Sequence, residues 1–335
     1  MANTQRITIT KFLFLTTLLL VLTLIVALFA LSIGSVNISV KDIITSFFNS
    51  KNSTVHQIIF DIRLPRILFA FAIGGGLSVA GAVFQAMLLN PLAEPYILGI
   101  SSGGSFGAVL SFLLGISFWG TQLFAFAGAL IVILLVFSLG RRFGEIEPDV
   151  LLLSGVMIGA FFAAGILLMT TMLDNSLRMA VLWLIGSLSF ASNQTLIYVL
   201  PITFITVILL TLNAQKYNVI SLGSESAKQL GINTKLVMNE TYILTSIMVG
   251  SIVSVSGIIG FVGLIIPHIS RMILGQDYRL IIPSSFFIGA MFLIIADTIA
   301  RTIISPSEIP VGAVTALIGA PVFIYLLRKR FNIYK

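Results

Sequence analysis

The chain has 335 residues, of which 58% are hydrophobic and only 9% are charged, and its mean hydropathy is +1.10. Soluble domains carry about 25% charged residues, so this composition excludes a soluble enzyme and a disordered chain. The absence of cysteine excludes a disulfide scaffold, thiolate metal sites and cysteine nucleophiles. The net charge of +7 is better explained by basic residues gathered on one side of a membrane than by nucleic-acid binding.

Long apolar runs indicate an all-α polytopic membrane protein. A bilayer core of about 30 Å requires about 20 helical residues, and ten runs are candidate spans, at residues 12–33, 66–89, 96–116, 118–140, 150–173, 194–213, 237–259, 260–274, 281–300 and 311–327. The eighth run is short, and eight or nine spans with re-entrant segments are the alternative. We expect the first run to be a retained span, because it is longer than the apolar core of about 7–15 residues in a secretory signal.

The basic residues predict a multi-pass protein of the cell membrane with both termini in the cytoplasm. If the N-terminus is inside, six of the 19 basic residues fall on the outer side and the other 13 on the inner side, as the positive-inside rule requires. The outer six are Lys41, Lys51, Arg63, Arg66, Arg178 and Arg301. An even number of spans returns the C-terminus to the inside.

Two segments resemble each other at an offset of 176 residues. Residues 77–81 match 253–257, Pro91 matches Pro267, and 97–99 match 273–275. Because the segments lie on predicted spans of opposite direction, we expect an inverted internal repeat within one domain, residues 1–335, with the pathway between its halves. Glycines such as those at 74–76 predict close helix packing, since no G-x-x-x-x-G-K-S/T motif for binding phosphate occurs.

The sequence offers no catalytic, metal or cofactor site. His56 and His268 are far apart and have no carboxylate at ligand spacing, and no H-E-x-x-H or G-x-S-x-G motif occurs. Transport energy would therefore come from an ion gradient or from a partner. Asp297 and Arg301 lie four residues apart on one predicted helix face. They could serve an ion-coupled transporter, or they could simply pair near the outer end.

The longest predicted inner loop runs from about 215 to 237. It contains Glu225-Ser226-Ala227-Lys228-Gln229-Leu230-Gly231, a short helix-forming segment that glycine ends. Taken alone, this segment suits a solvated loop helix as well as a surface that a cytosolic partner grips.

Six motifs in consistent order resemble the permease subunits of ABC importers for ferric siderophores, haem and vitamin B12. They are Arg63-Leu64-Pro65-Arg66 with Gly81, Gln85 and residues 90–95; residues 97–101; residues 183–188; residues 260–268; Ala296-Asp297 with Arg301; and residues 308–312 with 319–321. The resemblance spans nearly the whole chain. It implies a vitamin B12 permease-like fold of ten helices, with a short outer helix between spans five and six.

The same resemblance implies partners. It implies a second permease subunit, as a homodimer or heterodimer, with the pathway at their interface. It also implies two cytosolic ATPase subunits, which bind ATP and Mg²⁺, and an extracytoplasmic substrate-binding protein. This chain would itself bind no cofactor and interact with no nucleic acid.

Particular residues acquire roles by the same resemblance. The positions that would receive carboxylates of the binding protein are Arg63, Arg66 and Arg301. Exposed guanidinium groups suit this task, and contact with phospholipid headgroups is the alternative.

On the inner side, residues 219–232 resemble the loop that couples such permeases to the ATPase, although the usual Leu-Pro farther downstream is missing. The residues concerned are Gly223, Glu225, Ala227 and Gly231. Asn90, Pro91 and Leu92 match the inner gate, although an Asn-Pro turn alone would explain two of them.

The sequence therefore predicts the transmembrane permease subunit of a binding-protein-dependent ABC importer for an iron chelate, either a ferric siderophore or haem. A cobalamin importer is the alternative, and an ion-coupled secondary transporter or a structural scaffold is less favoured. The chain is not predicted to be an enzyme, because it has no P-loop and ATP hydrolysis would occur on the separate ATPase subunits.

Overall fold

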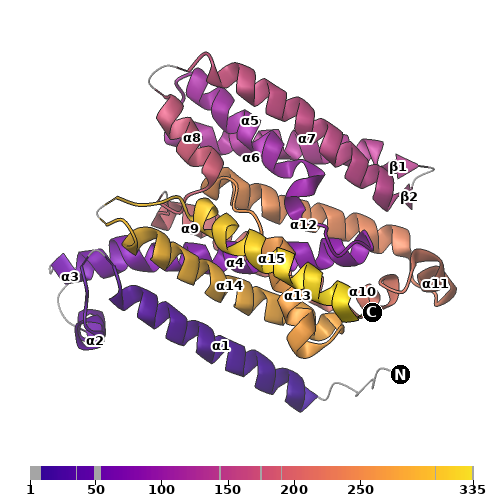
Figure 1. Cartoon of the computed structure of the whole chain (residues 1–335), viewed down its shortest axis with the longest axis horizontal. Coiled ribbons are helices and arrows are strands. Elements are labelled where there is room, and N and C mark those ends of the chain that lie inside the picture. Colours follow the sequence, from indigo (N-terminus) through magenta and orange to yellow (C-terminus); the bar gives the residue numbers. More distant parts are fainter. Residues whose placement is uncertain are drawn as a thin grey trace.

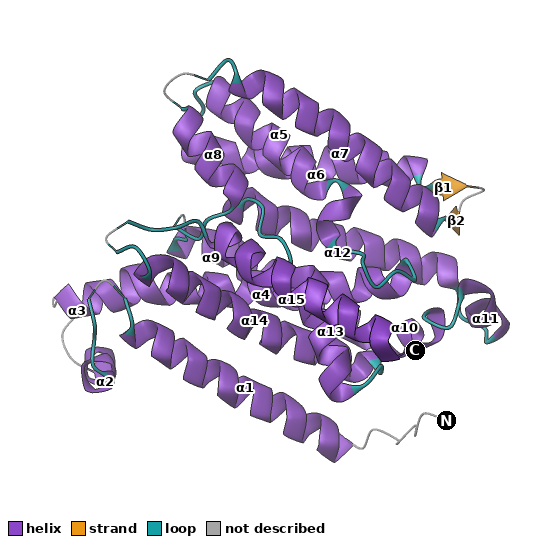
Figure 2. Ribbon diagram, viewed as in Figure 1, coloured by secondary structure: helices purple, strands orange, loops and turns teal. Residues whose placement is uncertain are grey.

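The computed structural model describes residues 9–34, 36–48, 54–142, 145–173, 176–189, 191–305 and 307–333, and this part of the chain is almost entirely helical (Figure 2). Lys51, one of the predicted outer basic residues, lies outside the described residues. The predicted all-α fold is confirmed.

Ten helices overlap the ten predicted spans (Figure 1). They are α1 (Ile9–Ser32), α4 (Leu64–Met87), α5 (Ile100–Leu113), α6 (Phe118–Leu139), α7 (Pro148–Thr170), α9 (Asn193–Leu212), α12 (Thr234–Ser256), α13 (Val262–Leu274), α14 (Tyr278–Thr302) and α15 (Val311–Ile333). Among the described residues, seven helices are long and apolar enough to cross a membrane. Shorter apolar segments within the part searched are α5, α13 and residues Val311–Leu326 of α15.

Short elements connect these helices. They are α2 (Val40–Phe48), α3 (Thr54–Gln57), the π-helical turn η1 (Ile58–Arg63), the 3₁₀ turn η2 (Pro95–Leu98), the hairpin β1 (Arg141–Arg142) and β2 (Glu145–Ile146), α8 (Leu177–Ile185), α10 (Ala214–Ile220) and α11 (Ser224–Gln229). A short helix between spans five and six was expected at residues 183–188, and α8 lies between these spans but begins six residues earlier and ends at Ile185. The helix α11 lies in the predicted coupling loop. In β1 and β2 the strands pair antiparallel.

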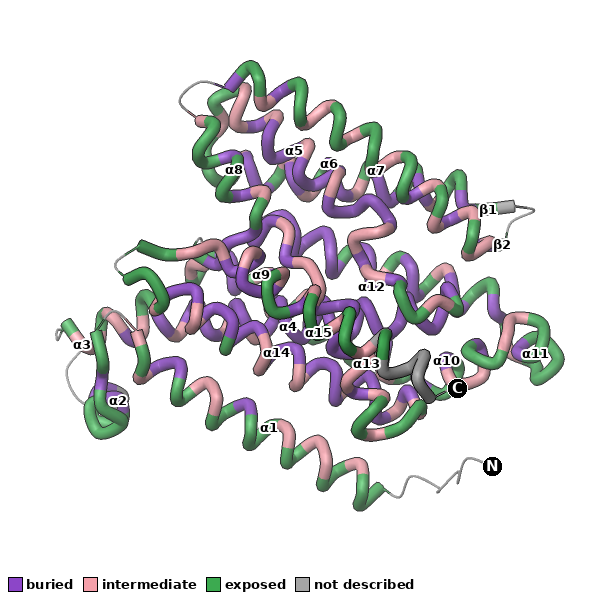
Figure 3. The backbone as a smooth tube through the Cα atoms, in the orientation of Figure 1, coloured by how far each residue is buried: buried purple, intermediate pink, exposed green. Residues whose placement is uncertain are grey.

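The helix α4 forms the centre of the molecule, whereas α1 and α7 lie at its edges (Figure 3). In an 18-residue apolar stretch of each helix, the share of buried residues is 89% for the span that contains α4. The same share is only 6% for α1 and 11% for α7. The exposed residues of α1 and α7 are mainly large and apolar. Such faces suit contact with lipid or another membrane helix, because neither medium requires polar side chains.

The helices around α4 approach closely at glycines. A Cβ atom on Gly81 would lie 1.8 Å from the carbonyl oxygen of Gly263 in α13, and one on Gly74 would lie 2.3 Å from that of Gly289 in α14. Both distances are far inside van der Waals contact, so these crossings require glycine. The predicted role of the small residues in helix packing is confirmed.

The third predicted span is wrong in length. It was expected at 96–116, but α5 has 14 residues, and α13 has 13. At 1.5 Å per residue each is about 20 Å long, too short for a bilayer core of about 30 Å. Each helix begins after a left-handed residue, at Gly99 (φ 74°) and Phe261 (φ 69°). Both helices therefore start inside the bundle, at a break in the chain that apolar composition conceals.

The order of elements repeats in opposite orientation. The helices α4, α5, α6 and α7 contain 24, 14, 22 and 23 residues, and α12, α13, α14 and α15 contain 23, 13, 25 and 23. The helix α4 follows α3 at one edge of the molecule and α12 follows α11 at the opposite edge, so the two run in opposite directions (Figure 1). In addition, α4 packs on α14 as α12 packs on α6.

The predicted register of this repeat is wrong. An offset of 176 places Gly99 opposite Gly275, which ends α13. The starts of α5 and α13, at Ile100 and Val262, are instead 162 residues apart. The 176-residue match paired similar small residues rather than equivalent structural positions.

Candidate functional site

Four charged side chains meet where α4 begins and α14 ends, and we call them the outer charge cluster: Arg66, Asp297, Arg301 and Glu308. The Arg66 guanidinium donates through Nε and Nη2 to Asp297 at 2.9–3.0 Å, and through Nη1 to both oxygens of Glu308 at 2.8 and 3.0 Å. Nε of Arg301 lies 3.2 Å from Asp297. The predicted proximity of Asp297 and Arg301 is confirmed, and Arg66 and Glu308 complete the cluster.

Arg63 lies in the same region but binds the backbone. Its Nη1 donates to the carbonyl oxygen of Leu31 at 2.5 Å, and its Nη2 donates to that of Val36. Nη2 of Arg301 donates to the carbonyl oxygen of Ala30 at 3.3 Å. The last turn of a helix has carbonyl groups without helical partners, and cations are favourable there. Two of the three arginines therefore hold the end of α1 against the bundle.

The expectation that these three arginines are exposed is wrong. Their exposed fractions are 4% for Arg63, 6% for Arg66 and 9% for Arg301. The reason is that carboxylates and carbonyls of the same chain bind them, which compensates for their removal from water. Their proposed role in docking a binding protein stays a prediction.

Glu308 is the accessible member of the outer charge cluster. Its side chain is 42% exposed, against 2% for that of Asp297. Partial burial acts to raise the pKa of Glu308, but the hydrogen bonds from Arg66 and Ser189 and the charges of Arg66 and Arg301 outweigh it and hold the pKa below its ordinary value. The carboxylate of Glu308 therefore lies between the Arg66 guanidinium and the surface of the isolated chain.

At the opposite end of α4 the predicted gate residues form a tight turn. Oδ1 of Asn90 accepts a hydrogen bond from the Leu92 backbone N–H at 2.9 Å, and the Asn90 carbonyl accepts one from Ala93 N–H at 3.1 Å. Pro91 and Leu92 are exposed. This is the Asn-Pro turn chemistry weighed above, and a gating role stays a prediction.

The predicted coupling loop forms the exposed helix α11. Gly223 (φ 118°) precedes it and Gly231 (φ 80°) follows it, both in backbone conformations that favour glycine. Ala227 is fully buried, whereas Glu225 is exposed. The helix is thus anchored through one small residue.

Lys228 of α11 reaches a segment distant in sequence. Its Nζ lies 2.9 Å from Glu145 in the β1–β2 hairpin and 3.4 Å from Glu225. The hydrogen bond to Glu145, followed by the nearby negative charges, raises the pKa of Lys228. The hairpin was not predicted, because two-residue strands have no detectable sequence period.

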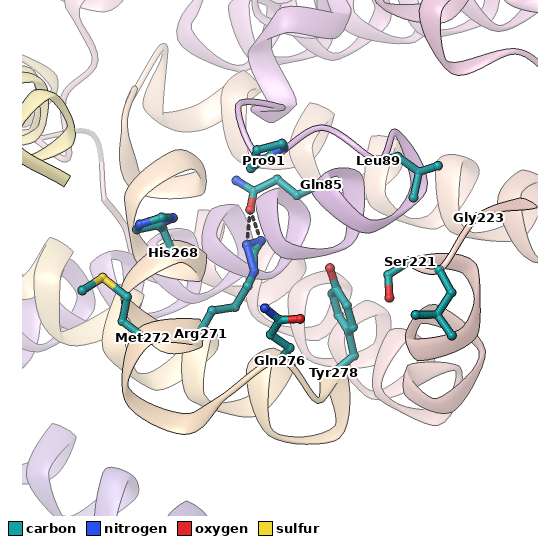
Figure 4. A pocket seen from close by; sticks show the side chains of 11 residues that line it. Gln85, Leu89, Pro91, Ser221, Gly223, His268, Arg271, Met272, Gln276 and Tyr278 are labelled. Carbon is teal, nitrogen blue, oxygen red and sulfur yellow. Dashed lines mark hydrogen bonds between the residues drawn. The ribbon is translucent and has the colours of Figure 1, made fainter. Parts of the chain in front are cut away.

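A cavity of about 620 Å³ joins the gate turn to the coupling loop (Figure 4). Pro91 lines one side and residues 221–223 line the other, with Gln85 of α4 and Arg271 of α13 between them. Nη1 of Arg271 donates to Oε1 of Gln85 at 2.7 Å, and Nη2 donates to the same oxygen. The start of the coupling loop and the gate turn therefore face the same cavity.

The role of Glu94, which lies within the motif at residues 90–95, was not predicted. Its carboxylate accepts a hydrogen bond from the backbone N–H of Phe261 at 2.8 Å, and the hydroxyl of Tyr96 accepts one from Ile259 N–H at 3.2 Å. Glu94 thus caps the N-terminus of α13, where a negative charge is favourable. The signal in the sequence was Glu94-Pro95, a polar break between apolar runs.

The sequence model described as the FecCD transport family matches residues 19–329 of this chain. The chain is 37% identical to the hemin transport system permease protein HmuU of Yersinia pestis, with 93% of this chain and 94% of that protein covered. It is 38% identical to the cobalamin import system permease protein BtuC of Halobacterium salinarum, with 83% of this chain and 75% of that protein covered.

A solved structure has a similar fold. It is described as an inward-facing conformation of a metal-chelate type ABC transporter. The TM-score is 0.83 at 33% sequence identity, with 96% of this chain and 100% of that chain covered.

Proposed function

This chain belongs to the FecCD transport family and is an ABC importer permease, and from that premise we propose that it forms half of a pathway at an interface with a second permease subunit. Two cytosolic ATPase subunits bind ATP and Mg²⁺ and drive the cycle, and a binding protein delivers the cargo. The observation that carries the proposal is the family match over residues 19–329, because it spans the bundle rather than one motif. Both termini are cytoplasmic in this proposal.

Energy enters through the coupling loop. The exposed helix α11, which is anchored through Ala227, fits a groove of the ATPase, and ATP-driven closure displaces it. The helix α11 packs on α10, and α10 packs on α4. The displacement therefore reaches Asn90, Pro91 and Leu92, at the end of α4, through packed helices. The ATPase with ATP bound and the ATPase after hydrolysis then favour different conformations of the pathway. This difference shifts the population from one pathway conformation to the other.

The binding protein docks at the outer charge cluster. Because Glu308 covers the accessible side of Arg66, an incoming carboxylate binds there by replacing Glu308. Arg63 and Arg301, which hold the end of α1, keep this surface rigid. The sequence predicted docking on three exposed guanidinium groups. In the present proposal only Arg66 binds the incoming carboxylate, and it does so by exchanging Glu308 for it.

The cargo is a metal chelate, with an iron chelate, a ferric siderophore or haem, as first choice and cobalamin as the alternative. The relatives support this range of cargoes, because one of them is named for hemin and another for cobalamin. The similar identities of the two relatives give no preference.

Transport assays test the proposal. Proteoliposomes containing the chain, its ATPase subunits and its binding protein should take up one of a panel of ferric siderophores, haem and cobalamin, and should do so only with ATP. Ala227→Arg should abolish uptake while the binding protein still docks. Uptake without ATPase subunits would contradict the proposal.

An ion-coupled transporter would require Asp297 to bind a cation during the cycle. Asp297 already lies between two guanidinium groups, so a further cation would have to displace one of them. Uptake that collapses with a protonophore but persists without ATP would favour this second function.

The absence of native cysteine allows a direct topology test. A membrane-impermeant thiol reagent should label Ser39→Cys in intact cells, but should label Ser226→Cys only after the membrane is opened.

A further inference from the structure

Gln85 uses both ends of its side-chain amide. It lies in the last turn of α4 and is 4% exposed. Its Oε1 accepts the hydrogen bonds from Arg271 (Figure 4), and its Nε2 donates to the backbone carbonyl of Ala93, which closes the gate turn, at 3.2 Å. Because a guanidinium only donates and a carbonyl only accepts, these partners fix the orientation of the amide. The side chain therefore joins the gate turn to α13.

A proline in α13 leaves a carbonyl for the same amide. Within a helix the Gly263 carbonyl would accept from the N–H of residue 267, but residue 267 is proline, which has no N–H. Nε2 of Gln85 lies 3.4 Å from the carbonyl oxygen of Gly263 and 3.4 Å from that of Leu264. Gln85 thus contacts α13 at its first turn through Nε2 and at its last turn through Arg271.

Two further side chains attach the segment after the gate turn to the start of α13. Glu94 accepts a hydrogen bond from the Phe261 N–H, and the Tyr96 hydroxyl accepts one from the Ile259 N–H. On the other side of the turn, the connection to α4 is Leu89, which is 50% exposed and has a left-handed backbone (φ 48°). Side-chain hydrogen bonds therefore tie the gate turn to α13, and we expect its position to follow that helix.

The inner end of α13 is held in turn by α10. Asn218 of α10 donates through Nδ2 to Asp277 at 2.9 Å and accepts through Oδ1 from the Tyr278 N–H at 2.8 Å. These two partners lie at the start of α14, shortly after α13 ends at Leu274. Because α10 also packs on the coupling helix α11, the inner end of α13 lies one packed helix away from the coupling helix.

We propose that Gln85 is the positioning residue of the gate turn. Its amide holds the turn against α13 while Arg271 holds the amide, and a shift of the inner end of α13 releases the turn. An amide suits this place because it accepts from a guanidinium and donates to carbonyls at the same time. The inference rests on the proposed function, because it assigns the turn a part in opening the pathway.

The position of the turn can be measured in the purified full chain without cargo or ATPase subunits. Because the chain has no cysteine, spin labels can be placed at Leu92→Cys in the turn and at Ile273→Cys near the end of α13, where the native residues are 45% and 67% exposed. Pulsed electron paramagnetic resonance should give one main distance and a minor population of displaced turns. We expect Gln85→Met to raise that population about fivefold, the size expected of one neutral hydrogen bond. Arg271→Met should raise it too, and the double variant should exceed neither effect by much, because both act through one amide.

Gln276 provides the matched control. It is a second glutamine on the wall of the same cavity, but it is exposed and makes no hydrogen bond among the described residues. Gln276→Met should leave the distances unchanged. In the transport assay, cargo imported per ATP hydrolysed should fall in Gln85→Met but not in Gln276→Met, while thermal melts show that both are folded.

The outcomes separate this proposal from the proposed function. Unchanged distances in a folded Gln85→Met protein, or an equal change in Gln276→Met, would overturn the positioning role. Arg271→Met keeps every backbone carbonyl in contact with Nε2, so it decides the question if Gln85→Met does not fold. Absence of ATP-dependent uptake by the wild type would contradict the proposed function and would leave the distance measurement unaffected.

Discussion

The geometry of the outer charge cluster predicts that the two carboxylates bound to Arg66 contribute very unequally to stability. Asp297 is 1% exposed, whereas the side chain of Glu308 is 42% exposed. Arg66→Met leaves the buried Asp297 with Arg301 alone, and breaking a buried pair in this way costs about 3–5 kcal/mol. Glu308→Gln removes an ion pair that water already screens, and such pairs contribute about 0.2–1 kcal/mol.

Double-mutant cycles measure this difference directly. We expect a coupling energy of about 2–3 kcal/mol between Arg66 and Asp297, and of at most about 1 kcal/mol between Arg66 and Glu308. The variants are Arg66→Met, Asp297→Asn, Glu308→Gln and the two doubles that contain Arg66→Met. Unfolding in mixed micelles can be followed by tryptophan fluorescence, since the chain has only two tryptophans and Trp183 is 4% exposed.

The control is an exposed pair at the other end of the molecule. Lys228 and Glu145 have side chains 37% and 51% exposed, so their coupling should be close to that of Arg66 with Glu308. Equal coupling of Arg66 to both carboxylates, or stronger coupling to Glu308, would refute the reasoning from burial.

Three other predictions concern helix packing, capping and pH. Gly81→Ala should cost more than about 3 kcal/mol of unfolding free energy or prevent folding, because its Cβ would lie 1.8 Å from the Gly263 carbonyl oxygen, whereas Gly250→Ala, with its nearest contact at 3.6 Å, should be tolerated in the same assay. Glu94→Leu should cost about 1–3 kcal/mol because it leaves a backbone N–H unpaired, and Glu94→Gln, which keeps an acceptor, should cost less; equal losses in a thermal melt would contradict the capping role. Because the pKa of Glu308 is held below its ordinary value, its stabilisation is complete above the unfolded-state pKa and is lost as pH falls through the folded-state pKa, so acid should lower the melting temperature of the wild type more than that of Glu308→Gln.

The spans could be predicted from sequence because the bilayer sets their length. A run of about 20 apolar residues has few alternatives to a membrane helix, and most predicted ends fall within three residues of the observed ones. The start of α5 is different, because the left-handed break at Gly99 lies within an apolar run. Composition reports where the chain is apolar, but not where its backbone turns.

The partners of the outer charge cluster could not be predicted for a related reason. Motifs located Arg66 and Asp297 separately, but the residues are 231 apart in sequence, and only packing of α4 on α14 joins them. The predicted exposure of the arginines rested on their place near a membrane surface. Burial depends on the carboxylates that the fold brings to them, and a linear motif does not contain this information.

The helix α4 connects the features on which the proposed function depends. Arg66 in its first turn belongs to the outer charge cluster, and Gln85 near its last residue lines the inner cavity and binds Arg271. Between them, Gly81 contacts the Gly263 backbone with no side chain in the gap. Because α4 is buried along most of its length, a displacement of the whole helix would move Arg66 at one end and the contact of Gln85 at the other together. An exchange of carboxylates at the outer surface and a movement of α11 at the inner one would therefore act on the same helix.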